Sequence, residues 1–153
     1  MACVPGDLLA PLTNGAGYDV SKEGLGLVVC DSSGTLTQRK PLQGFLLPRF
    51  GAACPLWTLY QALSRPLNAL REVTELSGRD IAIFETLAFA APITAPQFGA
   101  VPLLEAHMLI IPLSQGDVRK QTSNARKIGT SCRICPRSDC AGRREPSILT
   151  SGL

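Results

Sequence analysis

Three cysteines stand close together in the segment SCRICPRSDCAGRREP at residues 131–146, namely Cys132, Cys135 and Cys140. Two cysteines separated by two residues can turn both thiolates toward one metal centre, and Cys140 can add a third ligand from the same loop. Structural zinc and cubane iron–sulfur clusters both normally take four protein ligands. The triplet therefore predicts a fourth cysteine ligand elsewhere in the chain.

Cys54 is the best candidate for that fourth ligand. It opens the stretch CPLWTLYQALS, whose apolar residues recur at three- and four-residue spacing and predict a helix, with Pro55 in its first turn. A cysteine at a helix N-terminus is favoured as a thiolate by the free N–H groups and the helix dipole. Cys30 ends the apolar run LGLVVC and is expected to be a buried small hydrophobe, while Cys3 lies near a chain end and is a weaker candidate.

The spacing leaves the metal open. Zinc ribbons usually use two separate Cys-x2-Cys pairs, whereas this chain has one such pair and a third cysteine after a four-residue gap, which favours a 4Fe–4S cluster slightly over zinc. A basic loop with unligated cysteines is the third alternative. Eight of the fifteen Lys and Arg residues lie between Arg119 and Arg144, and their charge would offset a thiolate centre of either kind.

Composition indicates a globular protein. The chain has 153 residues, 45% hydrophobic and 18% charged, which suits one domain with a sizeable core. No apolar run is long enough to span a membrane, and the N-terminus lacks the pattern of a secretory signal. We therefore expect a cytoplasmic protein, in which clustered cysteines more often bind metal or do redox chemistry than form disulfides.

The expected fold class is α+β, with a mainly antiparallel sheet and few helices. Strands are predicted at residues 25–30 and 35–38, over DIAIFETLAFAA and over HMLIIPL, while ALREVTELSG fits a strand or a short helix. The segment SQGDVRKQTSNARKIG fits a helix or an exposed loop. A sensor-type sheet of the GAF or PAS kind is a plausible analogy. Residues 1–20 are expected to form a loose N-terminal segment before a single domain at residues 21–153.

Motifs for catalysis are missing from the sequence, so we expect no enzyme. The sequence contains no His-Glu-x-x-His, Walker or Gly-x-Ser-x-Gly pattern. The single histidine, His107, is expected to be a strand-start residue with a hydrogen-bonded ring. Trp57, Phe50 and Phe98 are expected in the core.

Two further alternatives are a structural zinc module that contacts protein or nucleic acid, and a redox enzyme that uses Cys132 and Cys135 as a dithiol pair.

Two motifs resemble one known family. RFGAACPLWTLYQAL at residues 49–63 and CRICPRSDCAGRREP at residues 132–146 resemble the C-terminal sensor domain of the short-chain fatty acyl transcriptional regulators, XRE-family proteins of the RamB and PrpR type. The match covers most of the chain and keeps the order of the motifs. The chain has no recognisable helix-turn-helix segment, so DNA binding by these residues is not implied, and a part of a larger regulator and a free-standing sensor both remain open.

The resemblance implies a ligand and a cofactor. It implies a domain that senses short-chain acyl-CoA and carries a 4Fe–4S cluster on Cys54, Cys132, Cys135 and Cys140. It also implies a set of charged residues that pair with the cluster or donate hydrogen bonds to its sulfurs: Arg133, Arg137, Asp139 and Arg143.

These inferences combine into one interpretation of the chain. The sheet and the helix that carries Trp57 are expected to form a partly apolar pocket for a short acyl chain, with basic side chains at its mouth for the CoA phosphates. The expected partners are the acyl-CoA and the rest of a DNA-binding regulator, with no membrane, and a homo-oligomer is one option for the assembly. The sequence does not indicate which acyl-CoA binds or which residues bind it.

Overall fold

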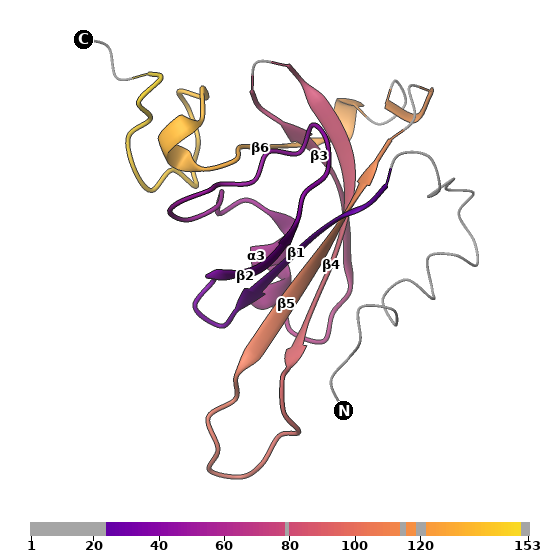
Figure 1. Ribbon diagram of the computed structural model, residues 1–153, viewed down its shortest axis with the longest axis vertical. Coiled ribbons are helices and arrows are strands. Elements are labelled where there is room, and N and C mark those ends of the chain that lie inside the picture. Colours follow the sequence, from indigo (N-terminus) through magenta and orange to yellow (C-terminus); the bar gives the residue numbers. More distant parts are fainter. Residues whose placement is uncertain (1–23, 79, 114–115, 119–121, 151–153) are drawn as a thin grey trace.

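A sheet of six strands dominates the molecule (Figure 1). The computed structural model describes residues 24–78, 80–113, 116–118 and 122–150, so the loose segment expected at residues 1–20 and Cys3 lie outside the described residues. The strands are β1 (Gly26–Asp31), β2 (Leu36–Lys40), β3 (Leu70–Leu76), β4 (Ala82–Pro92), β5 (Leu104–Pro112) and β6 (Arg126–Ile128). The helical elements in this part of the chain include the α-helix α3 (Thr58–Leu63) and the 3-10 turns η1 (Thr122–Asn124) and η2 (Cys132–Ile134).

The strand order is β2-β1-β5-β4-β3-β6. The first four neighbouring pairs are antiparallel, and β6 pairs with β3 in parallel. This confirms the predicted α+β class with a mainly antiparallel sheet. The segment ALREVTELSG, which fitted a strand or a helix, forms β3. The described part of SQGDVRKQTSNARKIG contains η1 and the short strand β6.

Local chemistry explains the first hairpin. The sequence DSSG joins β1 to β2, and the Asp31 carboxylate accepts hydrogen bonds from the Ser33 backbone N–H at 2.9 Å and from the Ser33 hydroxyl at 2.6 Å. Aspartate at the start of a turn commonly bonds the backbone two residues on, so this carboxylate fixes the reversal between the strands. The bonds from Ser33 lower the pKa of Asp31, which keeps the carboxylate charged.

The core lies between one face of the sheet and α3 with the loop that precedes it. Alternate residues of the central strands face this core, for example Val28 and Cys30 on β1 and Met108 and Ile110 on β5. Trp57, at the start of α3, is fully buried, which confirms its predicted place in the core. It packs on Phe45 with ring centroids 5.4 Å apart. The prediction that Cys30 is a buried core residue is confirmed, since its exposed fraction is 0%.

Two aromatic predictions are wrong. Phe50 is 90% exposed and Phe98 is fully exposed. Both residues lie in loops, Phe50 after β2 and Phe98 between β4 and β5, so neither is held against the sheet as a strand or helix residue would be. Among the described residues, no helix is long and apolar enough to cross a membrane.

Candidate cysteine centre and the adjoining pocket

The approach to α3 is tied to the segment that follows β6. The backbone N–H of Cys54 donates to the carbonyl of Thr130 at 2.9 Å, and the indole N–H of Trp57 donates to the carbonyl of Gly129 at 2.8 Å. Both bonds join residues more than seventy positions apart in the chain. We call residues 54–57 and 129–130 together the clasp, because it fixes the start of the cysteine-rich segment beside Cys54.

Gly129 brings two cysteine sulfurs to one place. Its backbone N–H donates to the Cys54 Sγ at 3.4 Å, and a Cβ built on Gly129 would lie 3.0 Å from the Cys135 Sγ. A side chain at this position would collide with the Cys135 sulfur, so the glycine allows the close approach. Cys54 and Cys135 therefore flank the same residue.

Cys54 is buried, with an exposed fraction of 5%. Burial raises the pKa of its thiol, hydrogen bonds from the backbone N–H groups of Gly129 and Leu56 lower it, and the nearby Cys132 and Cys135 raise it further. The thiol form of Cys54 is thus favoured, and a bound cation would have to displace its proton.

The expected position of Cys54 at a helix N-terminus is wrong in detail. The helix begins at Thr58, and residues 55–57 form a turn in which the Trp57 N–H donates to the Cys54 carbonyl at 3.1 Å. Pro55 therefore lies before the helix and not in its first turn. The clasp explains the shift, because Cys54 and Trp57 are both held by bonds to residues 129–130.

The remaining cysteines lie on the loop that follows. Cys132 begins η2, and its sulfur lies 3.9 Å from the carbonyl oxygen of Gly142. A Cβ on Gly142 would lie 2.9 Å from the Leu56 side chain, so this glycine lets the end of the loop pack beside the residues that precede α3. Cys140 is partly exposed, and its carbonyl accepts a hydrogen bond from the Arg143 N–H at 3.1 Å.

The cysteine thiols in this region are suitable metal ligands, although they are not arranged around one common point in the described part of the chain. Cys54, Cys132, Cys135 and Cys140 are all free thiols. Within residues 24–78, 80–113, 116–118 and 122–150, no group of three or more Cys, His, Asp or Glu side chains is arranged to hold a metal ion. The structure brings the sulfurs of Cys54 and Cys135 to Gly129, and Cys132 and Cys140 lie on the same loop as Cys135. The residue types fit zinc or an iron–sulfur cluster, both of which take thiolate ligands.

The charged residues of the loop fix its backbone. Arg143 donates to the carbonyls of Cys132 and Glu145, both at 3.3 Å, and to that of Arg137. Arg137 donates in turn to the carbonyl of Lys127 at 2.9 Å. The Arg133 and Asp139 side chains are exposed. Arg137 and Arg143 therefore hold the backbone around the cysteines in place by donating hydrogen bonds to its carbonyl groups.

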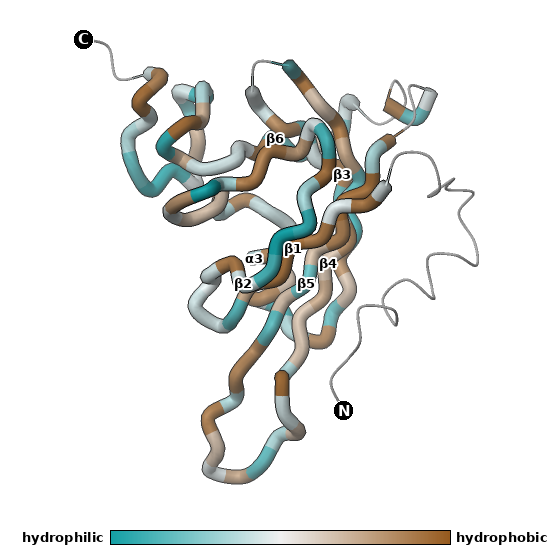
Figure 2. Tube along the Cα trace, in the orientation of Figure 1, coloured by the Kyte–Doolittle hydropathy of each residue, from teal (hydrophilic) through white to brown (hydrophobic). Residues whose placement is uncertain are grey.

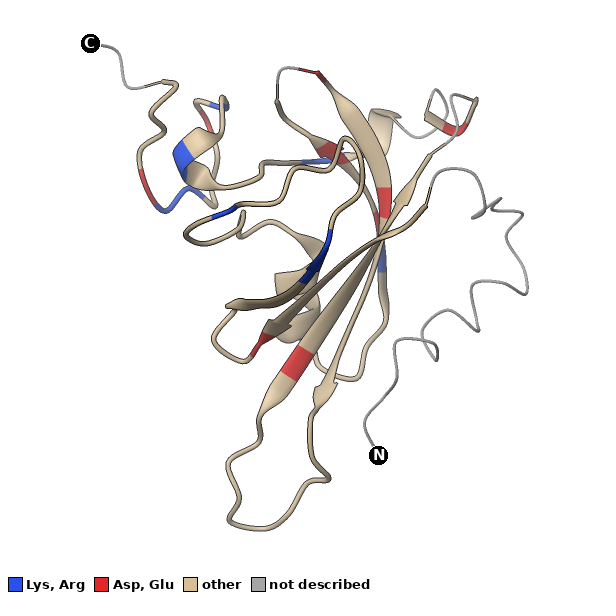
Figure 3. Cartoon of the chain, in the orientation of Figure 1, with Lys and Arg blue, Asp and Glu red and all other residues tan. Residues whose placement is uncertain are grey.

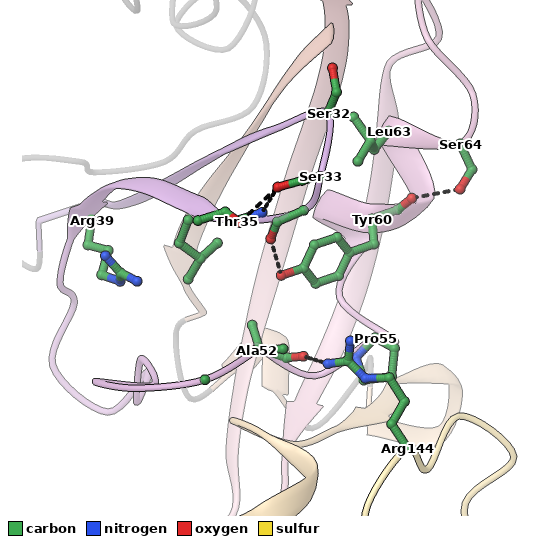
Figure 4. A pocket seen from close by; sticks show the side chains of 14 residues that line it. Ser32, Ser33, Thr35, Arg39, Ala52, Pro55, Tyr60, Leu63, Ser64 and Arg144 are labelled. Carbon is green, nitrogen blue, oxygen red and sulfur yellow. Dashed lines mark hydrogen bonds between the residues drawn. The ribbon is translucent and has the colours of Figure 1, made fainter. Parts of the chain in front are cut away.

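A pocket of about 370 Å³ adjoins the clasp (Figure 4). Its walls come from the β1–β2 turn, the loop at residues 51–55, α3 and the cysteine-rich segment. Leu36, Tyr60 and Leu63 supply apolar surface, and Arg39 and Arg144 supply positive charge. Arg144 also donates to the carbonyl of Ala53, the residue before Cys54. One arginine therefore belongs to the pocket and to the cysteine-rich segment at the same time.

Tyr60 fixes one wall of the pocket. Its hydroxyl donates to the carbonyl of Gly34 at 3.1 Å, which ties α3 to the β1–β2 turn. Burial raises the pKa of Tyr60 to about 12, so the hydroxyl stays protonated and keeps donating this bond at ordinary pH. The helix contributes to the pocket through Tyr60 and Leu63, while Trp57 is buried behind it in the core.

His107 lies outside this region. It is the fourth residue of β5, not the first, and its Nε2 lies 2.9 Å from a carboxylate oxygen of Glu105. Its Nδ1 is buried and has no hydrogen-bond partner among the described residues. The expectation of a hydrogen-bonded ring is therefore met at one nitrogen, and the expected place at the strand start is wrong because β5 begins earlier, at Leu104.

Three residues that position the site were not singled out for that role from the sequence. These are Gly129, Gly142 and Arg144. The glycines act through the space they leave, which no local pattern reveals. The spacing of Arg144 from Cys140 gave no reason to place it in a pocket with Arg39, because that neighbourhood depends on the loop conformation.

Comparison with known proteins identifies the class of domain. Residues 21–151 match the family described as short-chain fatty acyl coenzyme A regulator, C-terminal. The match covers most of the chain, so the chain belongs to this family, as its two motifs predict.

The relatives carry names of regulators. The chain is 30% identical over 126 residues to the HTH-type transcriptional regulator PrpR of Mycobacterium tuberculosis and 29% identical over 126 residues to the propionyl-CoA carboxylase regulator of Cereibacter sphaeroides. Each alignment covers 77% of this chain and 26% of the relative, so the chain spans about a quarter of their length. A solved structure of a Mycobacterium tuberculosis transcriptional regulator shares the fold, with a TM-score of 0.67 and 23% identity over 81% of this chain and 40% of that one.

Proposed function

We propose that this chain is the ligand-sensing part of a transcriptional regulator and that its ligand is a short-chain acyl-CoA. The observation that carries the proposal is the pocket between α3 and the β1–β2 turn, in a chain whose family is described by this ligand. An acyl-CoA needs an apolar recess for its acyl end and cations for its phosphates. Leu36, Tyr60 and Leu63 supply the recess, and Arg39 and Arg144 supply the cations.

The volume of the pocket suits the small end of the ligand. A space of about 370 Å³ lies at the lower end of the range for small-molecule sites, so it accommodates an acyl group with part of its pantetheine arm. The nucleotide end would lie over the rim, where Arg39 and Arg144 can each form charge-assisted bonds to phosphate oxygens. We therefore expect the interior of the pocket to select the length of the acyl chain and the rim to bind the CoA phosphates.

We further propose that Cys54, Cys132, Cys135 and Cys140 bind a 4Fe–4S cluster, with zinc as the alternative. The approach of Cys54 and Cys135 to the same glycine and the single Cys-x2-Cys pair support this proposal. When bound, the cluster would supply a redox-sensitive crosslink between the cysteine-rich segment and the residues before α3. The chain's own part is to present the sulfurs, with Gly129 and Gly142 allowing close approach and Arg137 and Arg143 holding the loop backbone.

Arg144 would connect the two parts of the proposed function. It lines the pocket while its guanidinium holds the carbonyl of Ala53 beside Cys54. A change in the cysteine-rich loop would move this arginine and thereby alter the pocket rim. Such a change in conformation would be transmitted to the DNA-binding part of the regulator through the contacts of that part with this domain.

Two measurements test the proposal separately. Anaerobically purified protein should be brown and contain iron and acid-labile sulfide, whereas Cys135→Ser should contain neither and Cys30→Ala should keep both. Colourless protein with one zinc per chain would favour the structural zinc alternative, and metal-free protein with reversible disulfide formation would favour the dithiol enzyme. Calorimetric titration with acetyl-CoA and propionyl-CoA tests the ligand, and the absence of binding at millimolar concentration would refute the sensor assignment.

A further inference from the structure

The β4–β5 connection forms a long exposed arm at one end of the molecule (Figure 1). Pro92 pairs with Leu104 at the end of the sheet, and the Ile93 N–H donates to the Leu103 carbonyl at 2.9 Å. All residues from 93 to 103, which we call the arm, are exposed. With eleven residues, the arm is longer than most hairpin loops, which have two to five.

The composition of the arm is unusual for an exposed loop. It contains no charged residue, and its exposed apolar side chains are Ile93, Phe98, Val101 and Leu103 (Figures 2 and 3). Its base is tied to the β1–β2 turn, because the Ser32 hydroxyl and the backbone of Leu104 exchange hydrogen bonds of 2.6 and 3.0 Å. A projecting apolar surface on an anchored base is typical of a protein contact.

The charge around the arm is acidic. Between Asp80 and Val118 the sequence contains no lysine or arginine, and of the carboxylates in this stretch Glu105 lies next to the arm, whereas Asp80, Glu85 and Asp117 lie toward the far ends of β4 and β5. Glu105 and Asp31 are direct cross-strand partners beside the base of the arm. Loops that enter membranes are normally flanked by cations that attract anionic lipids, so this acidic base disfavours a lipid surface as the partner.

A surface that could bind the arm lies toward the opposite end of the molecule. A groove of about 600 Å³, which we call the arginine groove, is lined by residues 46–52, Thr130, Ser131, Arg133, Ile134 and Glu145. Its exposed apolar side chains include Leu46, Phe50 and Ile134, and its cations are Arg49 and Arg133. It thus combines an apolar floor with positive charge, where the arm combines an apolar tip with an acidic base.

The arm cannot reach the groove of its own chain, because the two lie toward opposite ends of the long axis (Figure 1). We propose that the arm of one protomer docks in the arginine groove of a second copy. Two antiparallel copies related by a two-fold axis exchange both arms and close the assembly, as most homodimers do. Phe98 and Val101 then enter the groove, and Asp31 and Glu105 lie toward Arg49 and Arg133. This inference does not depend on the proposed ligand or cluster.

The test is the concentration-dependent mass of the full chain, measured by analytical ultracentrifugation under reducing anaerobic conditions. The wild-type chain should be a dimer that weakens as salt rises, because charge pairs contribute to it. Phe98→Asp and Phe50→Asp should each raise the dimer dissociation constant by at least about thirtyfold, the effect of losing a central aromatic contact. The matched control Ile81→Asp changes an exposed apolar residue outside both surfaces and should leave the dimer intact.

A mixing experiment separates this geometry from other contacts. The Phe98→Asp chain keeps an intact groove and the Phe50→Asp chain keeps an intact arm, so an equimolar mixture should recover heterodimers through one arm–groove contact. Failure of the mixture to associate would overturn the pairing of arm with groove. A wild-type chain that is monomeric at all concentrations, or that sediments with phosphatidylglycerol vesicles through Phe98, would overturn the proposal as a whole. Circular dichroism of each variant confirms that it is folded before its mass is interpreted.

Discussion

The indole N–H of Trp57 and the carbonyl oxygen of Gly129 are 2.8 Å apart, across 72 positions in the chain. This bond is buried and lies beside the Cys54–Thr130 backbone bond, so the residues before α3 and the cysteine-rich segment are held together without any metal. The clasp therefore fixes Cys54 relative to the start of the cysteine-rich segment through protein contacts.

Loss of the indole bond should weaken the whole domain. Trp57→Phe keeps most of the apolar volume but leaves the buried Gly129 carbonyl without its donor, which should lower the free energy of unfolding by about 1–3 kcal/mol. Urea denaturation followed by circular dichroism measures the change. The matched control Phe50→Leu alters an exposed aromatic residue and should change the stability little. Equal stability of Trp57→Phe and the wild-type chain would show that the clasp contributes nothing.

Gly129 should be needed for metal binding. In Gly129→Ala the new methyl group would lie 3.0 Å from the Cys135 sulfur, so the sulfur or the backbone has to shift and the placement of Cys135 relative to Cys54 changes. We expect lower metal content per chain after anaerobic purification, measured by elemental analysis. Gly78→Ala is the control, because the nearest atom to its new methyl group would lie at an ordinary 3.8 Å. Full metal content in Gly129→Ala would contradict a centre that includes both Cys54 and Cys135.

The two pocket arginines should contribute to ligand affinity. Arg39→Gln removes a cation from the pocket rim and should weaken acyl-CoA binding by about tenfold, since a charge-assisted bond to phosphate contributes roughly 1.5–3 kcal/mol. Lys40→Gln removes the same charge from the neighbouring residue of β2, which does not line the pocket, and should weaken binding much less. Calorimetry with propionyl-CoA measures both. Equal effects of the two substitutions would indicate only a general attraction to positive charge.

Cys30 should make the domain sensitive to alkaline pH. Burial raises the pKa of its thiol from 9.0 to about 11 in the folded chain. Above pH 9 the unfolded chain loses this proton first, so the contribution to stability is complete below pH 9 and is lost as pH rises toward 11. Cys30→Ala should therefore show a shallower fall in the free energy of unfolding between pH 9 and pH 11 than the wild-type chain. Parallel curves from urea titrations of the metal-free proteins would contradict this.

Much of the sheet could be predicted from its residues. Apolar residues predict strands in the run that ends at Cys30, in DIAIFETLAFAA and in HMLIIPL. The prediction succeeds there because these strands bury their apolar side chains in the core. The three-residue strand β6 carried no such signal, since Arg126 and Lys127 are exposed and only Ile128 is buried. Its pairing with β3 depends on where the chain arrives, and this is a property of the whole fold.

The cysteine site was predictable in its residue types but not in its geometry. The spacing of the triplet predicts a distant fourth ligand, and the predicted helix start and the family resemblance point to Cys54 for it. The structure brings Cys54 and Cys135 to the same glycine. The helix start was misplaced because bonds from Cys54 and Trp57 to the distant residues 129–130 override the local preference of Pro55 for a first helical turn. Arg144 and Gly129 act through contacts made only after the loop has folded back. The ligand assignment itself stays a proposal that metal analysis decides.

The pairing of β1 with β5 has a consequence for how the protein is made. During vectorial synthesis, Val28 and Cys30 leave the ribosome long before Met108 and Ile110 exist, and Cys54 must wait for Thr130. The nascent chain therefore exposes the apolar face of β1 until β5 has emerged, and Cys54 stays without its backbone partner until Thr130 follows. Completion of the sheet and of the clasp is then a late event in the synthesis of this stretch of chain.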